Sequence, residues 1–178
     1  MKAPMKLTWF GGTTVRVHIG GAILVIDPDG AELGLDSTEL VSGADQIIRS
    51  DGLGDIDLAT WRPRKVGRSL DDERLSPVRA WATESGGVLL DAAGEPPLLL
   101  FPYSEPHLGR WAGSAIIVIN GTGESLATLG AAILGEMPPR LLILAGDDAS
   151  IDHAIPILRD QLDGTGLVAL EPRMALEV

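Results

Sequence analysis

The chain has 178 residues, of which 45% are hydrophobic, and this length allows one domain with a buried core. Its formal net charge of −11 argues against nucleic acid or an anionic membrane as the main partner, because phosphate groups are bound by basic surfaces. The absence of cysteine excludes disulfides, thiolate metal ligands and cysteine nucleophiles. The sequence shows no signal-peptide pattern and no run approaching the ~20 apolar residues of a membrane span, so we expect a cytoplasmic protein.

The first part of the chain has the pattern of short β-strands. Apolar and polar side chains alternate over residues 13–19, as in a half-buried strand. Gly20-Gly21 can then turn the chain into an apolar strand, so residues 13–26 are predicted to form a β-hairpin. The elements predicted here are strands at 6–10, 13–19, 22–26 and 45–49, and a short helical turn at Ser37–Val41.

The second part continues with strands and then acquires helical spacing. Residues 60–77 are charged and contain two prolines, so we predict an exposed, irregular segment. Ser150 is the predicted N-cap of the second helix, and Gly164 follows its end. The elements predicted after this segment are strands at 78–83, 87–91, 97–101, 114–119, 140–144, 167–170 and 174–178, and helices at 125–134 and 150–162.

This order of elements predicts an α/β fold of the layered α+β kind, in a single domain spanning residues 1–178. The first two-thirds are expected to be mainly antiparallel β-structure, and the end of the chain has the order β-α-β-α-β. A layered sandwich accommodates this order better than an all-β barrel.

Residues 44–57 contain most of the candidate metal-binding or catalytic side chains. The apolar pair Ile47-Ile48 opens into a loop that carries Asp51, Asp55 and Asp57 between glycines. Carboxylates in a glycine-containing loop at the end of a strand are typical of metal or catalytic sites. The loop contains no histidine, cysteine or lysine.

Three framework segments resemble the metallo-β-lactamase superfamily, in particular its small lactonase-like metal-dependent hydrolases. They are Leu7-Thr8-Trp9-Phe10-Gly11, Val25-Ile26-Asp27-Pro28 and Ala44-Asp45 before a strand. The resemblance implies an αββα sandwich. It also implies a His-x-His-x-Asp-His signature after that strand, whose imidazoles would bind one or two metal ions that activate a water molecule.

The signature itself departs from the family pattern. Asp51 and Leu53 stand at the first two histidine positions, Asp55 keeps the aspartate, and Ile56 replaces the last histidine. Gly12 stands where the family often has another histidine after the first strand. His107 could match a histidine of a later loop, whereas the Gly121-Thr122-Gly123 region offers no bridging aspartate. Because leucine and isoleucine cannot ligate a metal, we expect no di-metal centre.

Two other sites remain open as alternatives. One divalent ion such as Mg²⁺ or Ca²⁺ could be held by oxygen ligands from Asp27, Asp51, Asp55 and Asp57. The preference of aspartate for turns favours the interpretation that Asp51 and Asp55 cap turns or are solvated. A basic patch could instead bind a small anion or an acidic partner, or be a solvated loop. That patch consists of Arg62, Arg64, Lys65 and Arg68.

Two further motifs are interpreted structurally. Gly121–Ser125 has Glu124 where a phosphate-binding loop has its lysine, so a strand-to-helix turn is favoured. The four tryptophans are expected to be core or interface anchors.

We therefore predict a metallo-β-lactamase-fold protein with a binding or assembly role, and with no catalytic residue and no cofactor. It could form a homodimer, and its partner is not indicated by the sequence. The alternatives are a hydrolase with a reduced metal site built from Asp51, Asp55 and His107, and a small-anion binder that uses the 62–68 loop.

Overall fold

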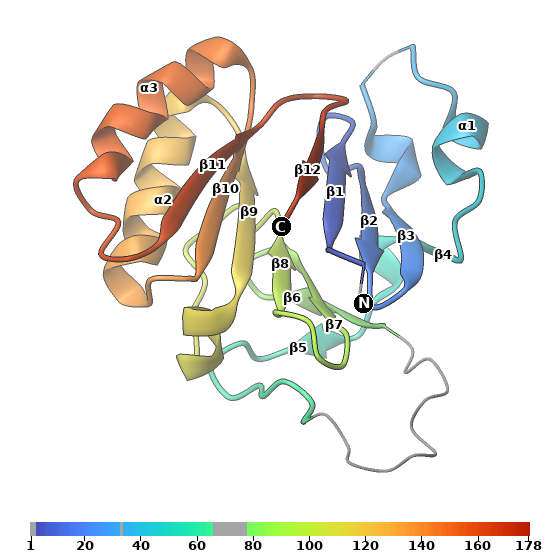
Figure 1. Cartoon of the computed structure of the whole chain (residues 1–178), viewed down its shortest axis with the longest axis horizontal. Helices are drawn as coiled ribbons and strands as arrows, with labels where there is room; N and C mark the ends of the chain where they lie inside the picture. The colour runs from blue at the N-terminus through green and yellow to red at the C-terminus, as the bar shows by residue number, and fades with distance from the viewer. Residues whose placement is uncertain (1–2, 33, 66–77) are drawn as a thin grey trace.

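A computed structural model describes residues 3–32, 34–65 and 78–178. Its strands form two sheets that pack face to face, with two long helices outside one sheet and a short helix outside the other (Figure 1). The five-stranded sheet has the order β12-β1-β2-β3-β4, and the seven-stranded sheet has the order β11-β10-β9-β8-β7-β6-β5. The predicted layered α+β sandwich is confirmed.

The five-stranded sheet is built mainly from the N-terminal part of the chain. β12 pairs with β1 in antiparallel orientation, so the last strand returns to the first. β3 and β4 are parallel and are connected through the helix α1 (Ser37–Val41), whereas the other pairs of this sheet are antiparallel, as mainly expected. The strands are β1 (Lys6–Trp9), β2 (Val15–Ile19), β3 (Ala22–Ile26), β4 (Gln46–Ile48) and β12 (Ala175–Glu177).

In the seven-stranded sheet only β7 runs against the other strands. The carboxyl ends of the remaining six strands therefore lie along one edge of the sheet. The strands are β5 (Asp55–Ile56), β6 (Arg79–Thr83), β7 (Val88–Asp91), β8 (Leu98–Leu100), β9 (Ile116–Asn120), β10 (Leu141–Ala145) and β11 (Gly166–Leu170). In the described residues, three 3-10 turns accompany the strands: η1 (Pro28–Gly30), η2 (Ser50–Gly52) and η4 (Arg110–Ser114).

The central strands of this sheet are buried on both faces, which explains their unbroken apolar sequences. In β9, Ile116 and Val118 point into the core between the sheets, whereas Ile117 and Ile119 point into the core under the helices. Trp61 contacts Trp81 and Trp111 edge to face, with ring centroids 6.0 and 5.0 Å apart. The predicted core role is confirmed for these tryptophans and for Trp9.

The helices that cover the seven-stranded sheet are α2 (Gly123–Glu136) and α3 (Asp148–Arg159). α3 begins earlier than predicted, because its N-cap is Asp147 and not Ser150. It also ends earlier, at Arg159 and not at residue 162. The Asp147 carboxylate accepts a hydrogen bond from the Ser150 backbone N–H at 2.8 Å. This bond and the nearby helix N-terminus favour the charged form, and the bonds from Ser150 lower the pKa of Asp147.

The outer face of the five-stranded sheet is covered by the thin layer that contains α1. The Arg16 guanidinium, on β2, donates to the carbonyls of Leu40 and Ser42 at 3.0 and 2.9 Å. It thereby satisfies carbonyl groups at the end of α1 and holds this helix against the sheet.

His18 lies on the same outer face and is opposite Lys6 in the β1–β2 ladder. Partial burial lowers its pKa below the ordinary 6.5, and the positive charges of Arg16 and Lys6 lower it further. Since the unfolded chain then binds a proton before the folded chain does, stability falls as the pH drops below 6.5 towards the folded pKa.

We expect an NMR titration of the His18 imidazole to have its midpoint below 6.5. His18→Gln should reduce the loss of stability measured by denaturant unfolding just below that pH, because glutamine does not titrate. Lys6→Met is the matched test of the charge effect and should raise the midpoint. A midpoint at or above the ordinary value would contradict this account.

Candidate functional site

Residues 49–57 carry the chain from the five-stranded sheet to the seven-stranded sheet. β4 ends at Ile48, where Asp27 N donates to the Ile48 carbonyl at 2.8 Å. η2 follows, and β5 then pairs in parallel with β6 in the other sheet. The loop that was identified from its carboxylates is thus the crossover between the two sheets.

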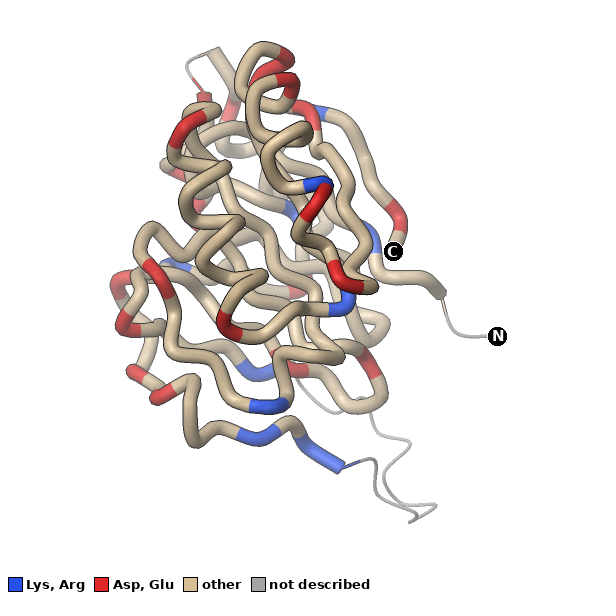
Figure 2. The backbone as a smooth tube through the Cα atoms, turned by 90° about the vertical axis from the view of Figure 1, so that its left-hand side faces the viewer, with Lys and Arg blue, Asp and Glu red and all other residues tan. Residues whose placement is uncertain are grey.

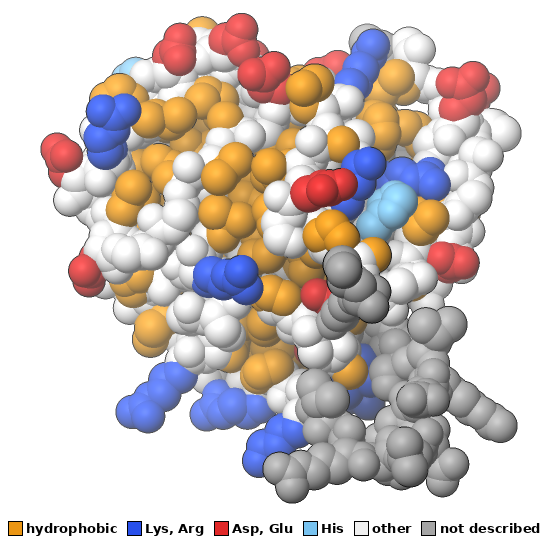
Figure 3. All heavy atoms as spheres, viewed as in Figure 1, with side chains coloured by type: hydrophobic (Ala, Val, Ile, Leu, Met, Phe, Trp, Pro, Cys, Tyr) orange, Lys and Arg blue, Asp and Glu red, His pale blue; other side chains and the backbone are white. Residues whose placement is uncertain are grey.

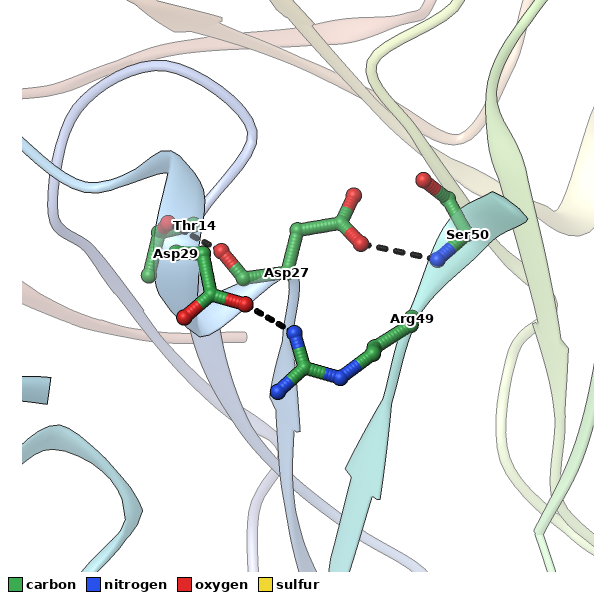
Figure 4. Close-up of polar contacts among 5 residues, drawn as sticks. All are labelled: Thr14, Asp27, Asp29, Arg49 and Ser50. Carbon is green, nitrogen blue, oxygen red and sulfur yellow. Dashed lines mark hydrogen bonds and ion pairs between the residues drawn. The ribbon is translucent and has the colours of Figure 1, made fainter. Parts of the chain in front are cut away.

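Asp27 fixes the start of this crossover (Figure 4). Its carboxylate accepts a hydrogen bond from Ser50 N at 2.7 Å, and its backbone carbonyl accepts one from the Thr14 hydroxyl. Asp27 has a left-handed backbone with φ 45°, which aspartate tolerates better than most residues. Beside it, Arg49 forms an exposed ion pair with Asp29.

Two apolar side chains occupy positions that resemble the family's histidines. Leu53 packs against the core between the sheets, and Ile56 packs against the core under the helices. The metal ligands of the signature require nitrogen or oxygen atoms at these positions. The residues present therefore do not fit a di-metal centre of this kind.

The surroundings of Gly12 leave no room for a side chain. It has φ +52°, and a Cβ atom there would clash with the carbonyl oxygen of Gly30. The amide nitrogen of Asn120 also donates to the Gly12 carbonyl at 2.6 Å, which joins the end of β9 to this loop. A histidine at position 12 would require the 27–30 turn to move.

Asp51 and Asp55 are exposed, and neither side chain makes a hydrogen bond to another residue of the described ranges. Turn capping in this segment falls instead to Asp27 and to Asp57. The Asp57 carboxylate accepts from Ala59 N at 3.0 Å and from the Thr60 hydroxyl at 2.9 Å. The capping role considered for Asp51 and Asp55 is therefore filled by their neighbours.

A pocket of about 210 Å³ lies where the chain leaves β5, β6 and β8. It contains His107, which the sequence analysis singled out, and Ile56 of the signature-like stretch. The exposed His107 imidazole is 3.9 Å from Glu136 Oε1, and the same oxygen accepts from Leu108 N at 3.1 Å. The lining residues are Ile56, Asp57, Leu58, Glu84, Ser85, Ser104, Glu105, Pro106 and His107.

The four candidate residues are thus divided between two places. Asp27 lies at the start of the crossover beside residues 49–51, whereas His107 lies beside its end. In the described part of the chain, no three histidine, aspartate or glutamate side chains are grouped closely enough to hold a metal ion. Asp27, Asp51, Asp55 and His107 do not form one cluster.

Glu84 and Glu105 were missed from the sequence, although together with Asp57 of the 44–57 loop they form the acidic lining of the pocket. A usable signal was present for Glu84, because it directly follows the carboxyl end of the strand predicted at 78–83. The carboxyl ends of parallel strands share one sheet edge, where α/β proteins commonly bind ligands.

The basic patch is only partly described, since Arg68 lies outside the described residues. Arg64 is paired with the buried Asp91, with Nε 3.2 Å from Oδ2, and Arg62 donates to the carbonyls of Thr60 and Trp61. Basic residues gather at this end of the molecule, whereas acidic residues are spread over much of the rest (Figure 2). These contacts stabilise the loop, and anion binding there stays a prediction.

Gly121–Ser125 forms the strand-to-helix turn that was predicted. β9 ends at Asn120 and α2 begins at Gly123. Gly123 lies close to His153 of α3, since a Cβ atom at Gly123 would be 2.8 Å from the His153 Cβ. No aspartate stands in this turn.

Comparison with solved structures shows the fold. The chain is similar to Igni18, described as a novel metallo hydrolase from the hyperthermophilic archaeon Ignicoccus hospitalis KIN4/I, with a TM-score of 0.51, 12% identity and coverage of 99% of both chains. It is also similar to a candidate Zn-dependent hydrolase of the metallo-β-lactamase superfamily from Thermotoga maritima. That comparison has a TM-score of 0.48 and 12% identity, and covers 94% of this chain and 99% of the other.

The similarity to Igni18 therefore confirms the expected fold, and that neighbour is a metallo hydrolase by its description. Scans against models of protein families and against curated proteins find no match. No helix in the described ranges is long and apolar enough to cross a membrane.

The Asp27 contacts predict unequal effects of two neighbouring substitutions. Asp27→Ala removes the acceptor for Ser50 N and places alanine in a left-handed conformation, so we expect a loss of about 2 kcal/mol in the free energy of unfolding. Asp27→Asn should retain most of the stability, because asparagine offers an acceptor oxygen and tolerates this backbone. Asp29→Ala is the matched control and should change the unfolding midpoint little, since its ion pair is exposed. Equal losses for both alanine variants, measured by urea denaturation, would contradict this account.

Arg64→Ala should also be destabilising, because it leaves the Asp91 carboxylate buried without this partner. We expect a loss of about 2 kcal/mol in the same assay. Lys65→Ala, at an exposed neighbouring position, serves as the control and should be nearly neutral. If the two variants behave alike, the Arg64–Asp91 pair has no structural role.

Proposed function

We propose that this protein acts through binding or assembly and not through metal-dependent hydrolysis. The observation that carries this proposal is the packing of Leu53 and Ile56 into two different cores. These positions resemble two ligand positions of the metallo-β-lactamase signature, and here they contribute apolar surface. The Gly30 carbonyl oxygen leaves no room for a side chain at Gly12, where the family often has a histidine, and this supports the same conclusion.

The hydrolase descriptions of the structural neighbours do not decide the activity of this chain. At 12% identity they share the fold, and one fold can support many unrelated functions. The chemistry must be argued from the site, where the crossover retains Asp55 but lacks the imidazoles that would fix metal ions beside it.

The second candidate is a hydrolase with one metal ion and a reduced site. It is favoured by one observation, namely that His107 and the end of the crossover line the same pocket. Asp51, Asp55 and His107 would be its ligands. A single ion held by oxygen ligands and one imidazole could act as a Lewis acid, but Asp51 and Asp55 would have to turn towards His107.

Metal analysis separates the two candidates. We expect protein purified without chelators to contain far less than one equivalent of zinc, manganese, iron, magnesium or calcium. A ligand at 100 times its Kd stabilises a protein by about 2.7 kcal/mol. A metal that bound to the folded chain would therefore raise the melting temperature when added in large excess. Because the proposal is that no metal binds, we expect no such rise.

Asp55→Ala and His107→Ala provide the matched variants. The binding proposal expects both to show the same metal content and the same melting behaviour in metal as the unmodified chain. One equivalent of metal that is lost in both variants, together with metal-dependent ester or lactone hydrolysis, would establish the reduced-site hydrolase instead.

A further inference from the structure

β11 is the longest edge strand in the described part of the chain. It is the edge strand of the seven-stranded sheet and has five residues, whereas the other edge strands have two or three. Its sequence, Gly-Leu-Val-Ala-Leu, contains no charged or polar side chain. Proteins normally protect a free edge with charges, prolines or very short strands, and β11 has none of these within its five residues.

The hydrogen-bonding direction of β11 follows from its pairing with β10. Gly166 N donates to the Arg140 carbonyl at 3.0 Å. In a parallel ladder alternate residues face the same neighbour, so Val168 also faces β10 and the intervening Leu167 and Ala169 direct their N–H and C=O groups to the free edge. Apolar side chains gather over the surface around β10, β11 and β12 (Figure 3).

The flank of α3 above this edge carries opposite charges at its two ends. The other flank faces α2, because Leu158 contacts Gly130 and His153 contacts Gly123. With 3.6 residues per turn, the flank towards β11 therefore contains Asp152, Ile155 and Arg159. Asp152 and Arg159 are exposed, and neither forms an ion pair with another residue in the described part of the chain.

We propose that β11 pairs in antiparallel orientation with β11 of a second copy of this chain, across a twofold axis at Val168. Leu167 of each copy then exchanges backbone hydrogen bonds with Ala169 of the other, and the two seven-stranded sheets become one continuous sheet. Such an interface is closed and uses the same surface on both copies.

The charges on α3 favour a second copy of this chain as the partner that pairs with β11. α3 runs opposite to β11, since it connects the parallel strands β10 and β11. The twofold axis consequently brings the two α3 helices alongside each other in antiparallel orientation, with Asp152 of one copy opposite Arg159 of the other. Parallel pairing of β11 would place like charges together.

Within one helix, positions 152 and 159 are about 10 Å apart, at 1.5 Å per residue, so they do not form a contact pair in the monomer. An effect of exchanging these two charges would therefore report a contact between two copies and not a contact within one copy. The inference is independent of the proposed binding role, since a metal-dependent enzyme could associate in the same way.

The test is the molar mass of the full chain in solution, measured by light scattering over a range of concentrations. We expect twice the chain mass of 18.7 kDa at high concentration. Ala169→Pro should shift the chain to monomer, because it removes a donor at the free edge while leaving the bonds to β10. Val168→Lys should do the same by placing a charge at the axis. Ile47→Lys alters the exposed Ile47 on β4, an edge strand of the five-stranded sheet, and should leave the dimer unchanged.

Charge exchange identifies the register and does not depend on how the strand variants fold. Asp152→Arg and Arg159→Asp should each weaken association about tenfold, since each places like charges together at both symmetry-related contacts. The double variant should restore association to the original level. Asp160→Arg, on the same helix but directed to solvent, is the matched control and should have no effect.

A chain that stays monomeric at every concentration overturns the proposal. It is also overturned by a dimer that survives both β11 substitutions, or by one that Ile47→Lys dissociates. Failure of the double charge exchange to restore association rejects the antiparallel register. Metal content is unaffected by all these outcomes, so failure here is distinct from failure of the proposed binding role.

Discussion

The hydrogen bond from Ser50 N to the Asp27 carboxylate holds the start of the crossover on which the two-sheet architecture depends. It joins the turn after β3 to the second residue after β4, where the chain must leave one sheet and enter the other. The Thr14 hydroxyl holds the carbonyl of the same aspartate, so three separate segments meet at Asp27. Because the backbone of Asp27 is left-handed, a residue with a bulky or branched side chain would be strained there. Aspartate satisfies the backbone and the hydrogen bond together.

From this start the crossover is fixed by packing. Leu53 contributes to the core between the sheets, and three residues later Ile56 contributes to the core under the helices. Full burial of such a side chain contributes roughly 1.5–3 kcal/mol, and these two are partly buried. In the resembling family, metal ligands would join the same segments. Here apolar contacts on the two sides of the seven-stranded sheet hold these segments in place.

Much of the strand pattern could be predicted from the sequence because the two burial patterns are distinct. Alternation over residues 13–19 indicates a half-buried strand, whereas uninterrupted apolar runs such as Ile116–Ile119 indicate strands covered on both faces. β5 escaped detection because two residues between a glycine and an aspartate show no periodicity. The α3 start was displaced because Asp147 and Ser150 are both strong N-cap residues, and only the backbone geometry decides between them.

The candidate site was harder to predict because it depends on strand direction. His107 and Asp55 were chosen from a resemblance, which identifies residues but does not bring their side chains together. The acidic lining, by contrast, follows from the alignment of β5, β6 and β8, whose carboxyl ends meet at one edge although they are far apart in sequence. β7 is the one strand that reverses, and this reversal places Glu84 and Glu105 on the same side. The carboxyl ends of the parallel strands therefore form a pocket whose acidic lining depends on the order and direction of the strands and not on the residues of the metal signature.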